Sequence, residues 1–401
     1  MIETIKSKSH TIEEYFLPIV LFGYVIASAL SVPLGIESRF ISVPFRILVF
    51  LFSALIIYRN YNSRIALFSV FTFVFFIVFY SVKACFSFQN DIYLPFTQKD
   101  RDEFFYRILI IDFLPVIALF LVDYTKINWT RVIKISWKIL FFALLVNAIY
   151  CIWQSDYNKT SGIFSVYYIS SGHFGLSLVL IAMVLLMFNK YEFIGIKKEY
   201  LKYSLLLGGF AIIVSAARSP LLTLVLISLY LVFLKKEIKY FLFLLGFVAF
   251  VVVSVFYFKQ ITTSNFAFIN RNFDFIFKGN SYGREYFLEK GLVVFKQSPI
   301  IGGRVLFEDF LYPHNVFVEL LMSGGIILLG LFLLIYWPLV KYAKWFLRYN
   351  DSKFYLTLLF CFFLQYLFLA QTSYNFISNP EFWYFSALII GVSLNLKNEK
   401  A

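Results

Sequence analysis

Charged residues are scarce in this sequence. Asp, Glu, Lys and Arg make up 15% of its 401 residues, whereas hydrophobic residues make up 61%. A soluble domain of this length could not bury that much apolar surface, and its core would not need it. The apolar residues also form continuous blocks of roughly 17–24, the length that crosses a bilayer as a helix. The composition therefore excludes an ordinary soluble α/β protein and predicts an all-α integral membrane protein.

Several other features are missing, and each absence narrows the function. The three cysteines, Cys85, Cys151 and Cys361, are scattered and lack metal-ligand spacing, which argues against a disulfide framework or a zinc site. No Gly-rich phosphate loop occurs, so neither ATP nor a nucleotide cofactor is expected. The first apolar block has no cleavage site typical of a signal peptide. The second half does not repeat the first, which weakens a transporter built from two homologous halves.

The apolar blocks predict about twelve transmembrane helices in a single polytopic membrane domain spanning residues 1–401. Lys and Arg concentrate in alternate loops, and the positive-inside rule then places both termini in the cytoplasm. The net charge of +13 reflects this anchoring to anionic lipid, and no nucleic-acid partner is expected. The predicted blocks cover approximately residues 15–34, 40–58, 65–84, 106–123, 135–154, 171–189, 203–217, 219–234, 239–258, 314–337, 354–372 and 382–396. The short seventh and eighth blocks could instead form a re-entrant pair.

The longest polar segment, residues 259–313, forms a large outer loop between spans 9 and 10. From Tyr282 to Gln297 its apolar residues repeat at helical spacing, with Ser281 as a candidate cap and Pro299 directly after the run. This pattern predicts an amphipathic helix lying along the membrane surface. Gly302 and Gly303 then predict a tight turn before the tenth span.

Three arginines and one histidine mark the outer side of the protein. Arg218 lies between two spans, Arg284 opens the surface helix, and Arg304 follows the double glycine. A guanidinium offers a fork of donors that matches phosphate oxygens, so the three arginines suggest a specific anion. His314 lies where the loop meets the tenth span, and its unperturbed pKa of roughly 6.5 suits a proton acceptor. Each residue also has a plainer interpretation, as a headgroup anchor, a solvated residue or a helix cap.

The remaining polar residues are more ambiguous. His173 has the surroundings of an interface residue, and Arg46 and Lys83 are most simply side chains that reach headgroups. Asp100 and Asp102 have the spacing of a metal-diphosphate site, but two carboxylates in a charged loop are usually solvated. We expect no metal there. Asp112 lies inside the fourth span, where a carboxylate is a functional candidate without an assigned role.

These motifs together resemble the O-antigen polymerase and O-antigen ligase superfamily of bacterial surface-polysaccharide enzymes. The resemblance rests on Ser-Ala-Ala-Arg (215–218), Gly283-Arg284, Ser-Pro-Ile-Ile-Gly-Gly (298–303), Pro-His-Asn-Val-Phe-Val-Glu (313–319) and Gly324-Gly325. It is strongest over residues 208–334. The loosest motif is the first, because many relatives have a second serine directly before the arginine.

The resemblance implies an inverting, metal-independent glycosyltransferase of the bacterial inner membrane. Arg218 and Arg284 would hold the undecaprenyl diphosphate of a lipid-linked glycan donor on the periplasmic face. His314 would act as general base or orient the acceptor hydroxyl. Arg304, Asn315, Ser215 and Tyr282 are the further candidates for substrate binding.

Within this superfamily, the richness in Phe and Tyr, with 53 and 28 residues, favours a polymerase that joins lipid-linked oligosaccharide repeat units into O-antigen or a related polysaccharide. Such a polymerase would work with a chain-length regulator. An O-antigen ligase, which transfers the glycan to lipid A core, uses the same donor and remains the alternative. A lipid-linked oligosaccharide flippase is the alternative of a different class, but it would need charges distributed through its spans. The sequence specifies neither the sugar and its linkage nor the oligomeric state.

Overall fold

The computed structural model describes residues 12–61, 66–89, 102, 104–106, 108, 111, 113–261, 266–279, 283–307 and 311–398. The described residues form helices and connecting turns without a β-strand. The helices are α1 (Ile12–Leu34), α2 (Arg39–Asn60), α3 (Leu67–Gln89), α5 (Leu114–Leu121), η2 (Tyr124–Lys126), α6 (Trp129–Gln154), α7 (Tyr168–Met187), α8 (Tyr191–Ile194), α9 (Lys198–Ser215), α10 (Arg218–Lys235), α11 (Ile238–Ile261), α12 (Ala267–Lys278), α13 (Arg284–Gln297), α14 (Val316–Ile335), α15 (Trp337–Lys341), η3 (Ala343–Trp345), α16 (Tyr355–Ala370) and α17 (Pro380–Asn398).

The predicted apolar blocks coincide with helices, because runs of this length satisfy all backbone hydrogen bonds internally only as helices. Among the described residues, eight helices are long and apolar enough to cross a membrane: α1, α2, α3, α6, α7, α10, α11 and α14. The apolar helix α16 is shorter, and the block at 106–123 is described only in part. The prediction of an all-helical membrane protein is therefore confirmed, while the count of about twelve spans stays a prediction.

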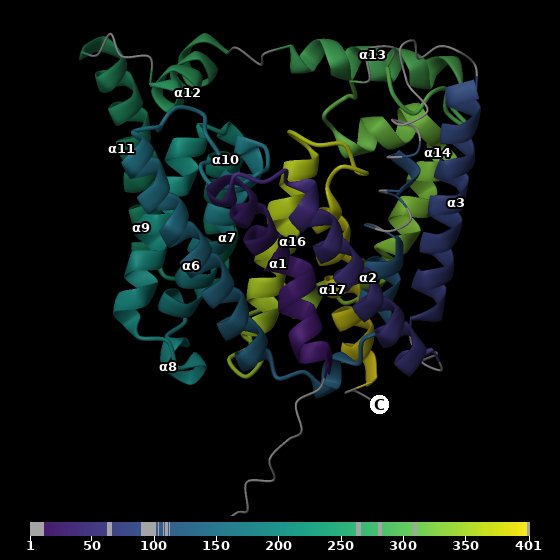
Figure 1. Ribbon diagram of the computed structural model, residues 1–401, viewed down its shortest axis with the longest axis horizontal. Coiled ribbons are helices and arrows are strands. Elements are labelled where there is room, and N and C mark those ends of the chain that lie inside the picture. Colours follow the sequence, from purple (N-terminus) through teal and green to yellow (C-terminus); the bar gives the residue numbers. More distant parts are fainter. Residues whose placement is uncertain are drawn as a thin grey trace, which may run out of the picture.

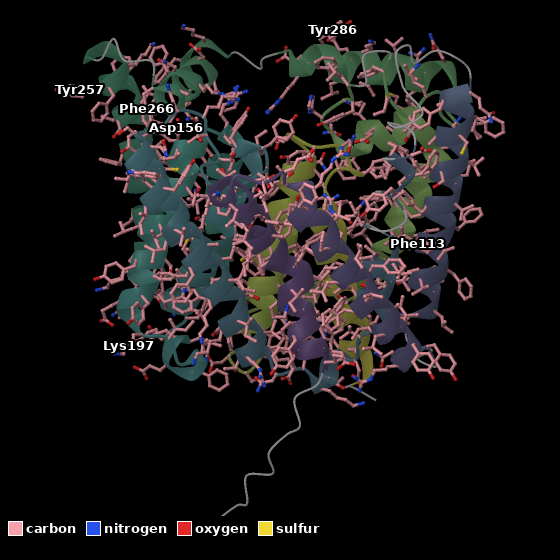
Figure 2. The ribbon with its side chains drawn as sticks, in the orientation of Figure 1. Phe113, Asp156, Lys197, Tyr257, Phe266 and Tyr286 are labelled. Carbon is pink, nitrogen blue, oxygen red and sulfur yellow. The ribbon has the colours of Figure 1, made fainter. Side chains whose placement is uncertain are left out.

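The long helices stand side by side, and α12 and α13 lie across one end of them (Figure 1). Helix α1 begins and α17 ends at the opposite end (Figure 1). Side chains follow the same division, since Tyr286 of α13 and Phe266 before α12 lie at one end and Lys197 at the other (Figure 2). The two helices of the long loop, α12 and α13, therefore lie at the end of the molecule opposite the start of α1 and the end of α17 (Figure 1).

Helix α7 lies inside the bundle and packs most extensively against α9. The two backbones approach closely where Gly175 faces Gly208: a Cβ at Gly175 would lie 2.6 Å from the Gly208 carbonyl oxygen. Small residues permit such close packing between membrane helices. This contact lies in the middle of α9, the helix that leads to the turn at Arg218.

The segment that follows α13 is locked onto α14. Gly325 interrupts α14 with a φ of 63°, and the freed backbone is satisfied from outside the helix, because the Ile326 N–H donates to the Pro299 carbonyl at 2.9 Å. Gly302 has a φ of 69° and the Gly303 N–H donates to the Met322 carbonyl at 2.8 Å. The tight turn predicted at the double glycine is confirmed. The close packing of this turn on α14 also explains the glycine at position 325, because a side chain there would overlap the Ile300 carbonyl.

Two sequence interpretations need correction in this region. Lys83 on α3 is not simply a headgroup anchor, because its ammonium donates to the Gly302 carbonyl at 3.0 Å and ties the turn to α3. The surface helix α13 begins at Arg284, as expected, but its N-cap is Gly283, with a left-handed φ of 80°, and not the candidate Ser281. Ser281 and Tyr282 themselves lie outside the described residues, as do Asp100 and Asp112.

Candidate functional site

The turn between α9 and α10 places Arg218. Ser215 ends α9, Ala216 adopts a left-handed φ of 50°, and Arg218 is the first residue of α10. The Ser215 hydroxyl donates to the Ile212 carbonyl at 2.8 Å and accepts the Ala217 N–H at 3.3 Å. Ser215 is fully buried. It therefore shapes the turn, and its predicted contact with substrate stays a prediction.

Arg218 and Arg284 line the same cavity of about 260 Å³, which we call the arginine cavity. Its walls are mainly apolar side chains of α10 and α11, among them Leu222, Val225, Val248, Val251 and Val252. The structure thus brings together two arginines that lie 66 positions apart in the sequence. A cavity lined by two guanidiniums and otherwise mainly by apolar side chains suits a ligand with an anionic head and a hydrocarbon tail.

Helix α12 contributes to the arginine cavity and was not predicted from the sequence. Its Phe275 ring lies 5.0 Å from the Arg218 guanidinium, a cation–π contact that orients a largely buried arginine. Its Arg271 lies close enough to Arg284 to lower the pKa of that guanidinium, although burial is the larger cause. Arg271 also donates to the Tyr168 hydroxyl at 3.2 Å. The apolar residues of 267–278 repeat at helical spacing, and this pattern could have revealed the helix from the sequence.

His314 has one ring nitrogen committed to the protein. Its Nδ1 lies 3.0 Å from the Ser373 carbonyl oxygen. A carbonyl only accepts hydrogen bonds, so the neutral ring carries its proton on Nδ1 and leaves the lone pair of Nε2 available. The pKa of His314 is lowered, first by burial and then by the charge of Arg284, while the Ser373 hydrogen bond opposes this. The imidazole is consequently neutral near pH 7, with the Nε2 lone pair free to accept a proton.

A chain of hydrogen bonds connects His314 to the start of α10. The Ser373 hydroxyl donates to the Ser219 hydroxyl at 3.4 Å, and Ser219 hydrogen-bonds with His173 Nε2 at 3.2 Å. His173 is 1% exposed and also bonds the Gln365 side chain through its carbonyl. The expectation that His173 is an interface residue is therefore wrong. It is a buried part of the scaffold beside Arg218.

The other candidate residues are less central. Asn315 caps α14, because its side-chain oxygen accepts the Val318 N–H at 3.1 Å. Arg304 is half-buried and does not line the arginine cavity. Asp102 is exposed, and the described residues contain no group of three metal-ligating side chains. For Arg304 and Asn315, substrate binding stays a prediction, and for Asn315 the structure supplies a capping role.

Glu319 ends the motif of residues 313–319, but no separate role was predicted for it from the sequence. It lies in the first turn of α14 and is fully buried. One carboxylate oxygen accepts the Phe376 N–H at 3.3 Å, which joins α14 to the segment that also carries Ser373. This hydrogen bond holds residues 373–376 against α14, and the Ser373 carbonyl of that segment bonds the His314 ring.

Comparison with known proteins identifies one family. Residues 203–335, about a third of the chain, match the O-antigen ligase family. The matched segment runs from α9 to the end of α14 and contains Arg218, Arg284 and His314. The match is consistent with the O-antigen polymerase and ligase superfamily and, with the eight long apolar helices, indicates a multi-pass membrane protein with a glycosyl-transfer type of activity. No curated protein matches the chain.

Proposed function

We propose that the protein polymerises undecaprenyl-diphosphate-linked oligosaccharide units on the periplasmic face of a bacterial inner membrane. The match to the O-antigen ligase family is the premise of this proposal. The observation that carries transfer from a lipid-linked diphosphate, the step that polymerisation shares with ligation, is the arrangement of Arg218 and Arg284 on one largely apolar cavity with neutral His314 nearby. The residues 259–313 would be the periplasmic loop of a single membrane domain. A chain-length regulator would be its protein partner.

The arginines would act on the leaving group. As the bond between the anomeric carbon and the diphosphate oxygen breaks, negative charge grows on the diphosphate. Fixed guanidiniums in a site with little water stabilise this charge more in the transition state than in the donor. The valine-lined wall of α11 would accommodate the first isoprene units of the lipid.

His314 would act on the acceptor. The attacking sugar hydroxyl forms the new bond to the anomeric carbon from the face opposite the diphosphate, which inverts that carbon. Its proton passes to the free Nε2 of His314, and the diphosphate leaves with the bonding electron pair. The hydrogen bond from Nδ1 to Ser373 keeps the ring oriented and stabilises its protonated form.

Ligation is the second candidate, favoured by the description of the matched family. A ligase would use the same arginine cavity and the same base, with a sugar of lipid A core as acceptor. The two activities differ only in the molecule that presents the hydroxyl. The contacts at Arg218, Arg284 and His314 support either reaction equally.

A gel of surface polysaccharide from a strain lacking this protein separates the candidates. Core carrying a single repeat unit supports polymerisation, whereas core without any repeat unit supports ligation. We expect that wild-type protein restores the ladder and that His314→Ala and Arg218→Ala do not, at equal membrane levels. A full ladder from both variants would refute the proposed site. An absence of lipid-linked units from the outer leaflet would instead indicate a flippase.

A further inference from the structure

A second cavity lies on the other side of the segment that holds His314. It has a volume of about 360 Å³, within the range of small-molecule sites. We call it the tyrosine cavity, because tyrosines from five separate segments line it together with two charged residues: Tyr24, Arg46, Tyr167, Tyr312, Tyr374, Glu381 and Tyr384. It is richer in polar groups than the arginine cavity, so it suits a different ligand.

The two charged residues face this cavity without neutralising each other by direct contact. Arg46 lies about two turns into α2, and its guanidinium is 5.7 Å from the centre of the Tyr24 ring. Burial raises the pKa of Glu381, in the first turn of α17, and the nearby charge of Arg46 opposes this rise. Among the described residues neither forms an ion pair. The expectation that Arg46 simply reaches headgroups is wrong, since it lines this cavity.

Such a lining matches the chemistry of a sugar ring. A pyranose has an apolar face of C–H groups and a rim of hydroxyls. Tyrosine rings pack against the apolar face and keep a hydroxyl for hydrogen bonding. A guanidinium and a carboxylate bind neighbouring hydroxyls, and hydrogen bonds to charged groups are the stronger kind. A lipid chain would gain nothing from these groups and would leave the charges desolvated.

The tyrosine cavity adjoins His314 through one backbone atom. The Ser373 carbonyl accepts the Tyr312 hydroxyl at 3.1 Å and the His314 Nδ1–H at 3.0 Å. The Tyr312 and His314 rings lie 4.4 Å apart. Thr372 lines the arginine cavity and Tyr374 lines the tyrosine cavity, so Ser373 sits in the wall between them. A sugar in the tyrosine cavity would therefore lie beside the base.

We propose that the tyrosine cavity binds the terminal sugar of the acceptor glycan, with Arg46 and Glu381 as its specificity-determining residues. The inference rests on the proposed function, because it assigns the second substrate of the same reaction. It divides the site in two: the diphosphate and lipid of the donor on the α10–α12 side, and the acceptor sugar on the α1, α2 and α17 side.

Binding measurements on the purified full chain test this assignment. The probes are the host's repeat-unit oligosaccharide, freed from its lipid by mild acid, and undecaprenyl diphosphate alone. We expect Arg46→Gln and Glu381→Gln each to weaken oligosaccharide binding by about tenfold or more, and to leave undecaprenyl diphosphate binding unchanged. Arg59→Gln on α2 and Glu37→Gln before α2 remove the same charges at exposed positions outside the cavity and should change neither affinity.

The outcomes separate this inference from the proposed function. Wild-type protein that polymerises or ligates glycan, but binds the oligosaccharide no better than the two variants do, overturns the sugar site alone. Wild-type protein that transfers no glycan at all overturns the proposed function. The two substitutions lie on separate helices, and retained undecaprenyl diphosphate binding shows that each variant is folded. Equal loss of both ligands would indicate a structural role and would also overturn the assignment.

Discussion

At the scale of single residues, His314 shows how much of a site depends on a distant partner. The sequence indicated a base at the junction of loop and span, and the structure gives its tautomer through Ser373, 59 positions later in the chain. Ser373 stands in no recognisable motif. The sequence could therefore single out His314 as a candidate base, but not the proton arrangement on its ring, because that requires knowing which backbone carbonyl meets the ring.

The lowered pKa of His314 predicts the pH dependence of transfer. A general base works in its neutral form, which persists above the pKa, so lowering the pKa extends activity toward acid. We expect the rate in proteoliposomes to fall as the pH is lowered, with the midpoint of the decline below about 6.5, the ordinary pKa of histidine. Because the charge of Arg284 helps lower this pKa, residual activity in Arg284→Gln should begin to fall at a higher pH. A wild-type decline centred above pH 6.5 would contradict this account.

Arg218 should not tolerate lysine. The change keeps the positive charge but removes the donor fork and the planar contact with Phe275. We expect Arg218→Lys to lower kcat/KM by about 10²-fold, the effect of losing one donor to a developing anion. Initial rates with purified lipid-linked donor measure this. Arg59→Lys on the exposed side of α2 is the matched control, and an equal loss there would show that the effect is not local.

Arg271 and Arg46 mark the limit of sequence reasoning at this scale. Both were indistinguishable from ordinary surface or headgroup arginines, because Arg271 lies between two asparagines in a polar loop and Arg46 lies between a phenylalanine and an isoleucine in an apolar run. Their importance comes from Arg284 and Glu381, which approach them from other helices.

At the scale of elements, the sequence predicted helices well and their interruptions less well. Long apolar runs permit little else in a membrane. The surface helix α13 was expected because its apolar residues repeat at helical spacing, whereas α12 was missed in the same loop. The break at Gly325 depends on the Pro299 carbonyl, which replaces a helical partner from outside α14, and no local pattern reveals that contact.

Gly325 and Gly330 provide a matched test of the lock between α14 and the loop. Gly325→Ala places a side chain at positive φ and against the Ile300 carbonyl. We expect it to destabilise the protein by about 1–3 kcal/mol, seen as a lower Tm in detergent, and to weaken transfer. Gly330→Ala on the same helix meets open space and should leave Tm unchanged or slightly raised. Equal Tm values for the two variants would show that the lock contributes little.

At the scale of the whole molecule, the charge distribution predicts an orientation that the fold makes testable. The end of α17 lies opposite α12 and α13 (Figure 1). If the positive-inside rule holds, a fluorescent protein fused to the C-terminus should fluoresce, and alkaline phosphatase fused there should be inactive. Truncation after α11 should reverse both signals, because a fusion at that point lies at the end of the molecule that carries α12. The opposite pattern in either pair would require the membrane orientation to be inverted.

The assembly of the two cavities could not be predicted from the sequence. Apart from Thr372, the arginine cavity is lined by α10, α11, α12 and the start of α13, which follow one another in the chain, and its two arginines were found as motifs. The tyrosine cavity joins α1 and α2 with α17, which lies more than 300 positions later in the chain, and no motif connects them. Local sequence motifs can reveal a site whose residues are close in the sequence. A site whose residues lie far apart in the sequence is revealed only by the packing of the helices.

Helices α7 and α11 lie at opposite extremes of burial, which determines how freely each can change during evolution. Protein surrounds α7 on most of its surface, whereas α11 buries little of its own. A substitution scan should therefore find α7 intolerant around its full circumference, since any change of volume meets a neighbour. Helix α11 should accept almost any exchange among apolar residues on its outer side and reject charge. In related sequences we therefore expect α11, which forms one wall of the arginine cavity, to diverge fastest. We expect Arg218, which lines the same cavity, to stay unchanged.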